Sequence, residues 1–380
     1  MNRNRVNKKR MGRARVLSQA AAGMLAAALC FQPMTALAGP AGDSSLTSSS
    51  SNVGPGGGSG GSNSGSTGSF GGSNSVSNGS VSAVTSGLGV YRVTENEGIG
   101  AIARGVDVSY WQQNVNWSQV ASDNVQFAML ATRFRGNVDP FFAMNAANAS
   151  QAGLRLGAYI YSYATSVEMA QQEADFVLNL IKDYPLSFPV VFDAEDVNTL
   201  GTLTPSQVSD VINAFCKRIQ DAGYYPMVYA NEYWIANKID MSKISYDMWV
   251  AKYQQKYTYS RTSMWQASNT GSVKGVNGNV DIDYLYKDYT QIIPGNTWRT
   301  IAGNRYYYQN HVMQKSAWIN DGQNWYYMNA SGNPSTGWLE LSGKKYYLEA
   351  DGHMITGWKT LDGGWRYFDA SGEQATGWRA

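Results

Sequence analysis

The sequence predicts an α/β protein, an irregular β/α (TIM-like) barrel followed by a β-hairpin repeat solenoid. Two observations support this fold class. Between residues 99 and 291, short apolar runs alternate with helix-like runs, a pattern typical of strands that are covered by helices. From residue 297 to 380, tryptophans recur every 20 residues, and a short fixed period indicates units that bury their faces by stacking on one another.

The first 98 residues are expected to precede the folded domains. Residues 1–38 carry seven Lys or Arg, an apolar run and an A-x-A site at Ala36-Leu37-Ala38, which together predict a secretory signal peptide. An uncleaved signal anchor is the alternative, although the apolar run is short for a membrane span. Residues 39–98 are rich in Ser and Gly and nearly uncharged, so we expect a disordered linker.

Composition excludes several classes of function. Without residues 1–38, 23 basic residues stand against 28 acidic ones, a net charge of −5, which argues against nucleic acid as a partner. Histidine occurs only at His311 and His353, which excludes a His-dependent nucleophile or a His-ligated zinc site between residues 39 and 310. We therefore expect no metal and no cofactor.

Cysteine usage predicts no disulfide. Cys30 lies in the N-terminal apolar run and Cys216 in a helix-like run, so a processed chain would keep a single thiol. We expect Cys216 to be a small buried apolar residue of an amphipathic helix.

Eight strand-like runs predict a closed barrel. They are residues 105–109, 127–132, 156–161, 189–193, 226–230, 248–252, 264–267 and 280–284. Helices are expected over 145–152 and 167–181, and from Thr204, where Pro205 and Gln207 complete a helix start and Gly223 marks the stop. The alternation predicts a parallel sheet, and the later connections look too short for full helices, so the barrel should be irregular.

Acidic residues follow three of these strands. Asp193 and Glu195 end the fourth strand, and side chains at i and i+2 share one face of a strand. Two neighbouring carboxyls raise the pKa of one of them, which is the condition for acid/base catalysis on a glycosidic bond. Asp107 ends the first strand, and Asp281 and Asp283 end the last. In a closed barrel these strands are neighbours, with the fourth strand opposite.

An interpretation without a catalytic or binding role stays open for each of these residues. A short acidic motif can be a solvated loop, and aromatic residues near the strand ends can simply fill the barrel core. Some of these rings could instead stack on sugars. The candidates for that role are Tyr159, Tyr161, Tyr229, Trp249 and Trp265.

The order of the motifs resembles a known family. Gly105-Val106-Asp107-Val108-Ser109, Pro189–Glu195, Trp249-Val250-Ala251-Lys252-Tyr253 and Gly278-Asn279-Val280-Asp281 resemble glycoside hydrolase family 25, the Chalaropsis-type lysozymes. The resemblance implies an irregular barrel that hydrolyses the β-1,4 bond between N-acetylmuramic acid and N-acetylglucosamine in peptidoglycan. It implies Glu195 as general acid, with Asp193 as its partner at the acetamido group or the anomeric carbon. Asp107 and Asp281 match the other active-site acids.

Two stretches depart from the family pattern. Residues 131–135 read Ala-Thr-Arg-Phe-Arg where an Arg-Ala-Gly-like run is common, and Tyr159-Ile160-Tyr161 lacks the His often found after the first Tyr. These departures concern substrate contacts rather than the acids. Retention or inversion depends on the separation of the carboxyls, which a sequence does not contain.

The C-terminal repeats place Trp at 298, 318, 338, 358 and 378, with a Tyr nine residues after each of the first four. They resemble cell-wall-binding repeats of the choline-binding type, which implies hairpins with aromatic cages suited to quaternary ammonium groups. A purely structural role for these rings is the alternative. The candidate ligand-binding residues are Trp318, Trp325, Tyr327, Trp338, Tyr347, Trp358 and Trp365. The implied partner is a wall polymer, either a choline-bearing teichoic acid or a glycan.

Together these features predict a secreted muramidase that acts on peptidoglycan glycan strands and is held on the wall of a Gram-positive-type bacterium by its tail, which raises its local concentration. A catalytically silent wall-binding or adhesion protein is one alternative. Another glycan hydrolase is the second, although a chitinase-type barrel would carry a longer acidic run than Val190-Val191-Phe192 allows.

Overall fold

The computed structural model describes residues 83–93, 98–253 and 255–377. The predicted signal peptide, Cys30, most of the predicted linker and Trp378 lie outside these residues. Within the described part of the chain, no helix is long and apolar enough to cross a membrane.

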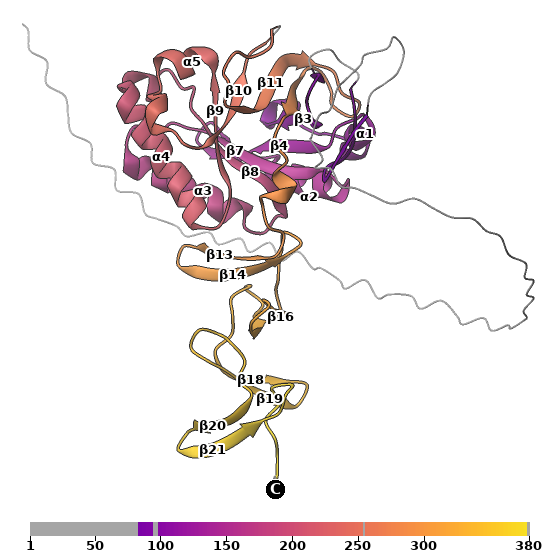
Figure 1. Ribbon diagram of the computed structural model, residues 1–380, viewed down its shortest axis with the longest axis vertical. Coiled ribbons are helices and arrows are strands. Elements are labelled where there is room, and N and C mark those ends of the chain that lie inside the picture. The colour runs from indigo at the N-terminus through magenta and orange to yellow at the C-terminus, as the bar shows by residue number, and fades with distance from the viewer. Residues whose placement is uncertain (1–82, 94–97, 254, 378–380) are drawn as a thin grey trace, which may run out of the picture. The chain divides into compact units, whose positions relative to one another are not determined.

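Eight strands close into a barrel, as the sequence predicts (Figure 1). They are β3 (Ala103–Val108), β4 (Phe127–Ala131), β7 (Arg155–Tyr161), β8 (Leu186–Asp193), β9 (Pro226–Asn231), β10 (Asp247–Ala251), β11 (Thr262–Gly271) and β12 (Val280–Leu285). Neighbours in the barrel follow chain order, and β12 closes it by pairing with β3. The ends of β3 and β12 therefore adjoin, with β8 on the opposite side.

The prediction that all strands of the sheet are parallel is wrong for one strand. β12 runs antiparallel to both β11 and β3. The connection over residues 272–279 is too short for the crossover that a parallel return requires. As a result, the start of β12 lies at the same rim as the ends of the parallel strands.

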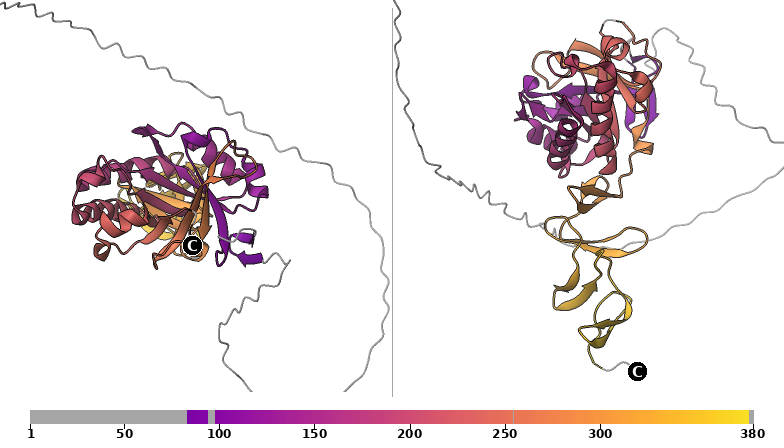
Figure 2. Two further views of the ribbon diagram at one scale, coloured as in Figure 1. Left: turned by 90° about the horizontal axis from the view of Figure 1, so that it is seen from above. Right: turned by 90° about the vertical axis from the view of Figure 1, so that its left-hand side faces the viewer.

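Helices lie outside the barrel strands (Figure 2). They are α1 (Trp117–Ser122), α2 (Phe142–Gln151), α3 (Val167–Ile181), α4 (Pro205–Asp221) and α5 (Glu232–Asn237). α3 and α4 lie side by side and are joined by an ion pair between Arg218 and Asp175 at 2.8 Å. Cys216 is a fully buried free thiol on α4, as expected.

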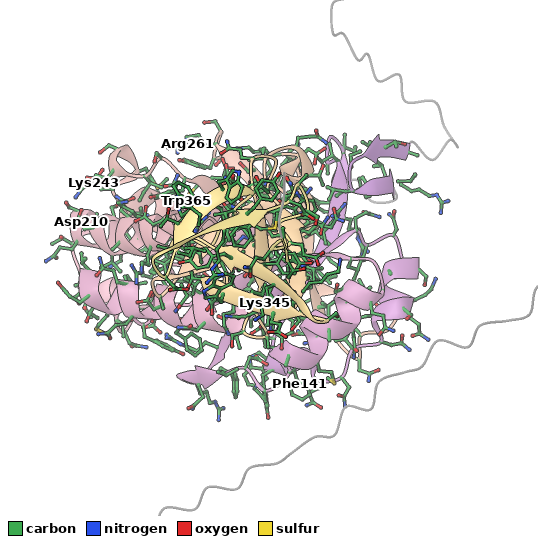
Figure 3. The ribbon with its side chains drawn as sticks, turned by 90° about the horizontal axis from the view of Figure 1, so that it is seen from below. Phe141, Asp210, Lys243, Arg261, Lys345 and Trp365 are labelled. Atoms are coloured by element: carbon green, nitrogen blue, oxygen red, sulfur yellow. The ribbon has the colours of Figure 1, made fainter. Side chains whose placement is uncertain are left out.

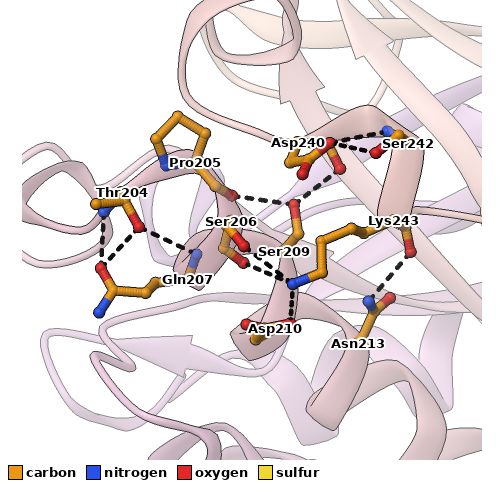
Figure 4. Close-up of polar contacts among 10 residues, drawn as sticks. All are labelled: Thr204, Pro205, Ser206, Gln207, Ser209, Asp210, Asn213, Asp240, Ser242 and Lys243. Atoms are coloured by element: carbon orange, nitrogen blue, oxygen red, sulfur yellow. Dashed lines mark hydrogen bonds and ion pairs between the residues drawn. The ribbon is translucent and has the colours of Figure 1, made fainter.

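The predicted start of α4 is confirmed. Thr204 Oγ1 accepts a hydrogen bond from the Gln207 amide, and Gln207 Oε1 accepts one from the Thr204 amide. These two bonds satisfy amide groups that a helix leaves unpaired at its start. Close by, Lys243 Nζ contacts Asp210 at 2.5 Å and ties the short helix η4 (Met241–Lys243) to α4 (Figure 4).

Side-chain alternation along the strands divides the core into two layers. On β8, Val190 and Phe192 pack outward in the layer beneath the helices, whereas Val191 packs in the barrel interior. Asp193 has the same parity as Val191 and therefore faces inward. The inner layer also contains Met129 from β4, so apolar side chains fill the barrel beneath its acidic rim.

Part of the predicted linker is folded, so the expectation of disorder over residues 39–98 is wrong there. β1 (Ala83–Ser86) and β2 (Gly89–Arg92) form a hairpin. Tyr91 is 1% exposed in the outer core, and Arg92 exchanges two hydrogen bonds with the Asn124 side chain. One large apolar side chain is enough to fix this short segment on the barrel.

The tail consists of four hairpins, one for each 20-residue period. They are β13 (Thr297–Ile301) with β14 (Asn304–Gln309) and β15 (Val312–Met313), β16 (Ala317–Asn320) with β17 (Trp325–Met328), β18 (Gly337–Leu341) with β19 (Lys344–Leu348), and β20 (Gly357–Leu361) with β21 (Gly364–Phe368). In all four, the Trp is the cross-strand partner of the Tyr nine residues later. This pairing explains the spacing seen in the sequence.

The first hairpin, which begins at the predicted domain boundary, packs against the barrel. The Arg299 guanidinium is buried between the rings of Tyr224 and Tyr308, 3.9 and 4.2 Å from their centroids. The Tyr308 hydroxyl donates to the Lys182 carbonyl at 2.8 Å. Ile301 also joins the outer core of the barrel. The structural boundary therefore falls after β15, which ends at Met313.

Candidate active site

Three of the four predicted acids line one cavity. Asp107 and Asp281 are direct partners in the antiparallel pairing of β3 with β12, which puts both carboxyls on one face at the same rim. Asp193 comes from β8, and all three line a cavity of about 430 Å³. These three carboxyl-bearing residues therefore lie around one cavity, as the order of the strands predicts.

The fourth acid, Glu195, follows β8 and is half-buried beside this cavity, without being one of its lining residues. Its Oε1 accepts a hydrogen bond from the Asn231 amide at 2.5 Å. Asn231 is itself held as the cap of α5, because its Oδ1 accepts from the Trp234 amide. The carboxyl of Glu195 thus has a fixed position next to Asp193.

Burial raises the pKa of every one of these carboxyls. The pKa of Asp107 lies well above its usual range because of desolvation and the charges of Asp281 and Asp283. The pKa of Asp193 is raised likewise by burial and then by Glu195 and Asp196.

The pKa values of Asp281 and Glu195 are also raised, but by less. Desolvation raises the pKa of Asp281 to about 6. It also raises the pKa of Glu195, against the opposing effect of the hydrogen bonds from Asn231. A cluster of this kind keeps some carboxyls protonated near neutral pH, so that they can donate a proton. Asp193 Oδ1 is buried without a hydrogen-bond partner, which leaves it available to a bound substrate.

Gln266 links the acids to the aromatic wall, a role that sequence reasoning missed. Its Nε2 donates to Asp107 Oδ2 at 2.7 Å, and its Oε1 accepts from the hydroxyls of Tyr229 and Tyr253, both at 2.8 Å. Because Gln266 is 4% exposed and both ends of its side-chain amide are hydrogen-bonded, it holds Asp107 in one orientation. Gln266 follows Trp265 on β11, so the alternation of side chains along this strand was the signal that could have found it.

Asp283 is a second buried partner. It lies one inward position beyond Asp281, opposite Gly105, where a Cβ would collide with the Phe127 ring. Its Oδ1 accepts from the Trp249 indole at 2.9 Å, and its side chain is fully buried. Burial and the charge of Asp281 raise its pKa, which in turn favours proton sharing within the cluster.

Four of the five predicted aromatic residues line the cavity: Tyr159, Tyr161, Tyr229 and Trp249. The expectation for Trp265 is corrected, because its ring is 1% exposed and packs outside the barrel against Tyr257 and Tyr284. Gln266 occupies the inward position of β11 instead.

A small hairpin forms one wall of the cavity. β5 (Arg133–Phe134) and β6 (Asn137–Val138) arise where the sequence departs from the family pattern. Phe134 stacks on Tyr110 with centroids 4.0 Å apart, and the exposed Arg135 lies over Phe134 at 5.0 Å. Arg133 is paired with Glu173 at 2.5 Å. This wall adds basic and aromatic groups beside an acidic rim.

The tail residues predicted to bind ligand fall into several groups. Trp318 contacts Tyr327, and Trp338 contacts Tyr347, with centroids 5.3 Å apart in both pairs. Trp358 and Trp365 lie 6.5 Å apart on the last hairpin, where Trp365 is exposed (Figure 3). Trp325 is also exposed. Among the described residues, no group of three or more His, Cys, Asp and Glu is arranged to hold a metal ion.

Comparison with family models identifies two kinds of module. Residues 106–276 match the model of glycosyl hydrolases family 25. Residues 316–333 match a cell wall binding repeat, and residues 335–378 match a choline-binding repeat.

Several known proteins are similar to the barrel. The uncharacterized protein YegX of Escherichia coli K12 is 31% identical over 189 residues, which cover 47% of this chain and 68% of YegX. Lysozyme M1 of Streptomyces globisporus is 30% identical over 195 residues, which cover 47% of this chain and 66% of that enzyme. Among solved structures, a bacterial lysozyme from Streptomyces coelicolor matches with 25% identity and a TM-score of 0.41, covering 50% of this chain and 95% of that one.

Proposed function

Since this chain belongs to glycosyl hydrolases family 25 and is a glycoside hydrolase with choline-binding repeats, we propose that it is a muramidase. It would cleave the β-1,4 bond between N-acetylmuramic acid and N-acetylglucosamine in peptidoglycan. The observation that carries this proposal is the single cavity in which Asp107, Asp193 and Asp281 meet between aromatic walls. Sugar rings bind such walls through their C–H faces, and glycosidic bonds are hydrolysed by paired carboxyls.

In this proposal Glu195 is the general acid. Its raised pKa favours the protonated carboxyl, and in the reaction that proton would pass to the bridging oxygen as the glycosidic bond breaks. Asp193 lies beside it and lines the cavity, and its Oδ1 is buried without a hydrogen-bond partner. It would orient the acetamido group or stabilise positive charge at the anomeric carbon.

The opposite side of the cavity would hold the substrate in place. Gln266 fixes the orientation of Asp107, and Asp281 lies beside Asp107. Tyr159 and Tyr161 would then flank the sugar rings. Such positioning contributes to catalysis because a bound substrate needs no further search for the reactive geometry.

We further propose that the enzyme is exported and that its tail holds it on the cell wall, through quaternary ammonium groups of a choline-bearing wall polymer. The exposed ring of Trp325, on the same hairpin as the Trp318–Tyr327 pair, supports a binding role, since aromatic faces attract such cations. On an insoluble substrate, this attachment raises the effective concentration of the barrel at the glycan.

One experiment tests the proposed reaction. Purified peptidoglycan is digested with the full chain, and the new reducing sugar is identified by mass spectrometry after borohydride reduction. Reducing N-acetylmuramic acid ends are expected, and Glu195→Gln should produce none. Reducing N-acetylglucosamine ends would indicate a different glycosidase. The absence of new ends, together with retained wall binding, would favour the catalytically silent alternative.

A further inference from the structure

Three aromatic sites lie where one tail hairpin meets the next. Site 1 consists of Trp298, Tyr307 and Tyr326, site 2 of Trp318, Tyr327 and Tyr346, and site 3 of Trp338, Tyr347 and Phe368. In each site the tryptophan lies 5.1–5.3 Å from the tyrosine of its own hairpin. It lies 4.9–6.0 Å from the ring of the next hairpin. The three sites are therefore built on one plan.

Site 1 already contains a cation. The Arg305 guanidinium lies over the Trp298 ring, 4.2 Å from its centroid. Its Nη1 donates to the Asp351 carbonyl at 3.3 Å, which fixes the arginine in this position. Arg305 is adjacent to the Trp298–Tyr307 pair on the same hairpin. The protein thus satisfies the attraction of this ring for a positive charge with its own side chain.

Site 3 contains a second internal cation. In the 20-residue period, Arg366 stands where sites 1 and 2 have Tyr326 and Tyr346. Its guanidinium lies 5.7 Å from the Trp338 centroid, and its Nε is buried without a hydrogen-bond partner. Lys345, on the neighbouring hairpin strand, lines the same pocket as Trp338 and Arg366. At this site an arginine therefore stands in place of an aromatic ring, in a pocket that Glu340, Asp362 and Glu373 also line.

Site 2 differs from both neighbours. The rings of Trp318, Tyr327 and Tyr346 are all half-buried, so part of each is accessible. Trp325 lies 20 residues after Arg305 and 20 before Lys345, so it occupies their position in the repeat. Its side chain is 47% exposed. Within the described part of the chain, no Lys or Arg lies over a ring of this site. Site 2 is the inter-hairpin site that has aromatic residues at all of these positions.

We propose that Arg305 and Arg366 are built-in occupants of sites 1 and 3, so that the inter-hairpin sites bind one external quaternary ammonium group, at site 2. This inference rests on the proposed function of the tail and adds the number of ligands that its inter-hairpin sites bind. Two cations at one small aromatic site repel each other, and neither arginine can leave by losing its charge. An external cation at site 1 or 3 would have to displace the arginine from its ring.

The inference is tested by isothermal titration calorimetry of choline chloride into the full chain. The wild-type protein is expected to bind one choline per chain, and Trp318→Ala should reduce binding at least tenfold. Tyr233→Ala, which removes an exposed aromatic side chain from α5 of the barrel, should leave one binding site with unchanged affinity. Near-ultraviolet circular dichroism of each variant establishes that the tail keeps its packing.

A gain of binding provides a test that does not depend on loss of fold. Arg305→Trp removes the internal cation of site 1 and installs the residue that site 2 has at this position, so two cholines per chain are expected. Two or three cholines on the wild-type chain, or retained binding in Trp318→Ala, would overturn this proposal but leave choline as the wall ligand. No binding by the wild type or by Arg305→Trp would overturn the ligand itself and this proposal with it.

Discussion

Asp107 and Asp281 stand directly opposite each other across the antiparallel contact of β3 and β12, so two carboxyls share one spot at the rim of the barrel. The charge of Asp281 is a leading cause of the raised pKa of Asp107. In an ordinary strand pair, this arrangement of like charges is destabilising. This repulsion therefore lowers the folding stability of the protein at the site where we propose that catalysis occurs. The lost free energy of folding should be measurable.

Replacing Asp281 should stabilise the protein at neutral pH but not in acid. The folded-state pKa of Asp281 is about 6, above the unfolded value, so its folded form binds the proton more tightly. The protein therefore loses stability as the pH rises from about 4 through 6. Asp281→Asn removes this loss and should raise the unfolding free energy by roughly 2 kcal/mol at pH 7.5, with little change at pH 3.

Thermal denaturation across this pH range measures the effect. Asp210→Asn serves as the control, because Asp210 is a surface acid paired with Lys243 and its loss should cost less than about 1 kcal/mol. Equal stability of Asp281→Asn and wild type at pH 7.5 would contradict this account.

Replacing Gln266 should impair catalysis through Asp107. Gln266→Leu keeps the volume but removes the hydrogen bond that lowers the pKa of Asp107, so that pKa should rise further. We expect kcat to fall about tenfold to a hundredfold because a carboxyl that positions the substrate is displaced, and an apparent pKa of the pH–rate profile to move upward. Gln220→Leu, an exposed change on α4, is the control. A lower rate with an unmoved pH profile would show that Gln266 has only a structural role.

Replacing Glu195 should abolish hydrolysis without unfolding the barrel. Glutamine keeps an oxygen that can accept from the Asn231 amide, yet it cannot donate a carboxyl proton. Lysis of purified walls by Glu195→Gln should fall by about 10²- to 10⁴-fold, measured by the loss of turbidity, while the melting temperature stays near the wild-type value. Wild-type lysis by this variant would remove Glu195 from the role of general acid.

Two truncations should separate wall binding from folding. Deleting residues 316–380 leaves the first hairpin on the barrel, so cleavage of soluble muropeptides should persist while sedimentation with intact walls decreases. Deleting 298–380 also removes Arg299, Ile301 and Tyr308 from the outer core, and buried losses of this kind cost several kcal/mol. That variant should be poorly soluble or unfolded by circular dichroism. Equal stability of the two truncations would contradict the structural boundary after β15.

The general plan of the barrel is readable from the sequence because strand ends, helix caps and apolar periods are local features. All eight strands and the start of α4 at Thr204 follow from such features. The direction of β12 is not local, because side chains alternate in the same way in either direction. Asp281 reaches the predicted rim only because β12 is reversed, since it lies at the start of that strand rather than its end.

The errors in predicting which side chains face the cavity have a similar cause. Trp265 and Gln266 are adjacent on β11, and a shift of one residue decides which of them faces the barrel interior. An aromatic residue is the natural candidate for a sugar platform, but the structure places the amide inside. Likewise, Tyr91 lies in a Ser- and Gly-rich region, and its contacts with the barrel are not visible in the sequence.

The position of Arg299 between Tyr224 and Tyr308 has a consequence for chimeric enzymes. A tail grafted at the connection before residue 297 would bring a foreign hairpin against this barrel, and Tyr224 would lose the partner it stacks on. A splice after Lys315 keeps the native hairpin and exchanges only the repeats from residue 316 onward, where the repeat family match begins. Recombination between wall hydrolases of this kind should therefore tolerate crossovers at the second hairpin better than at the first.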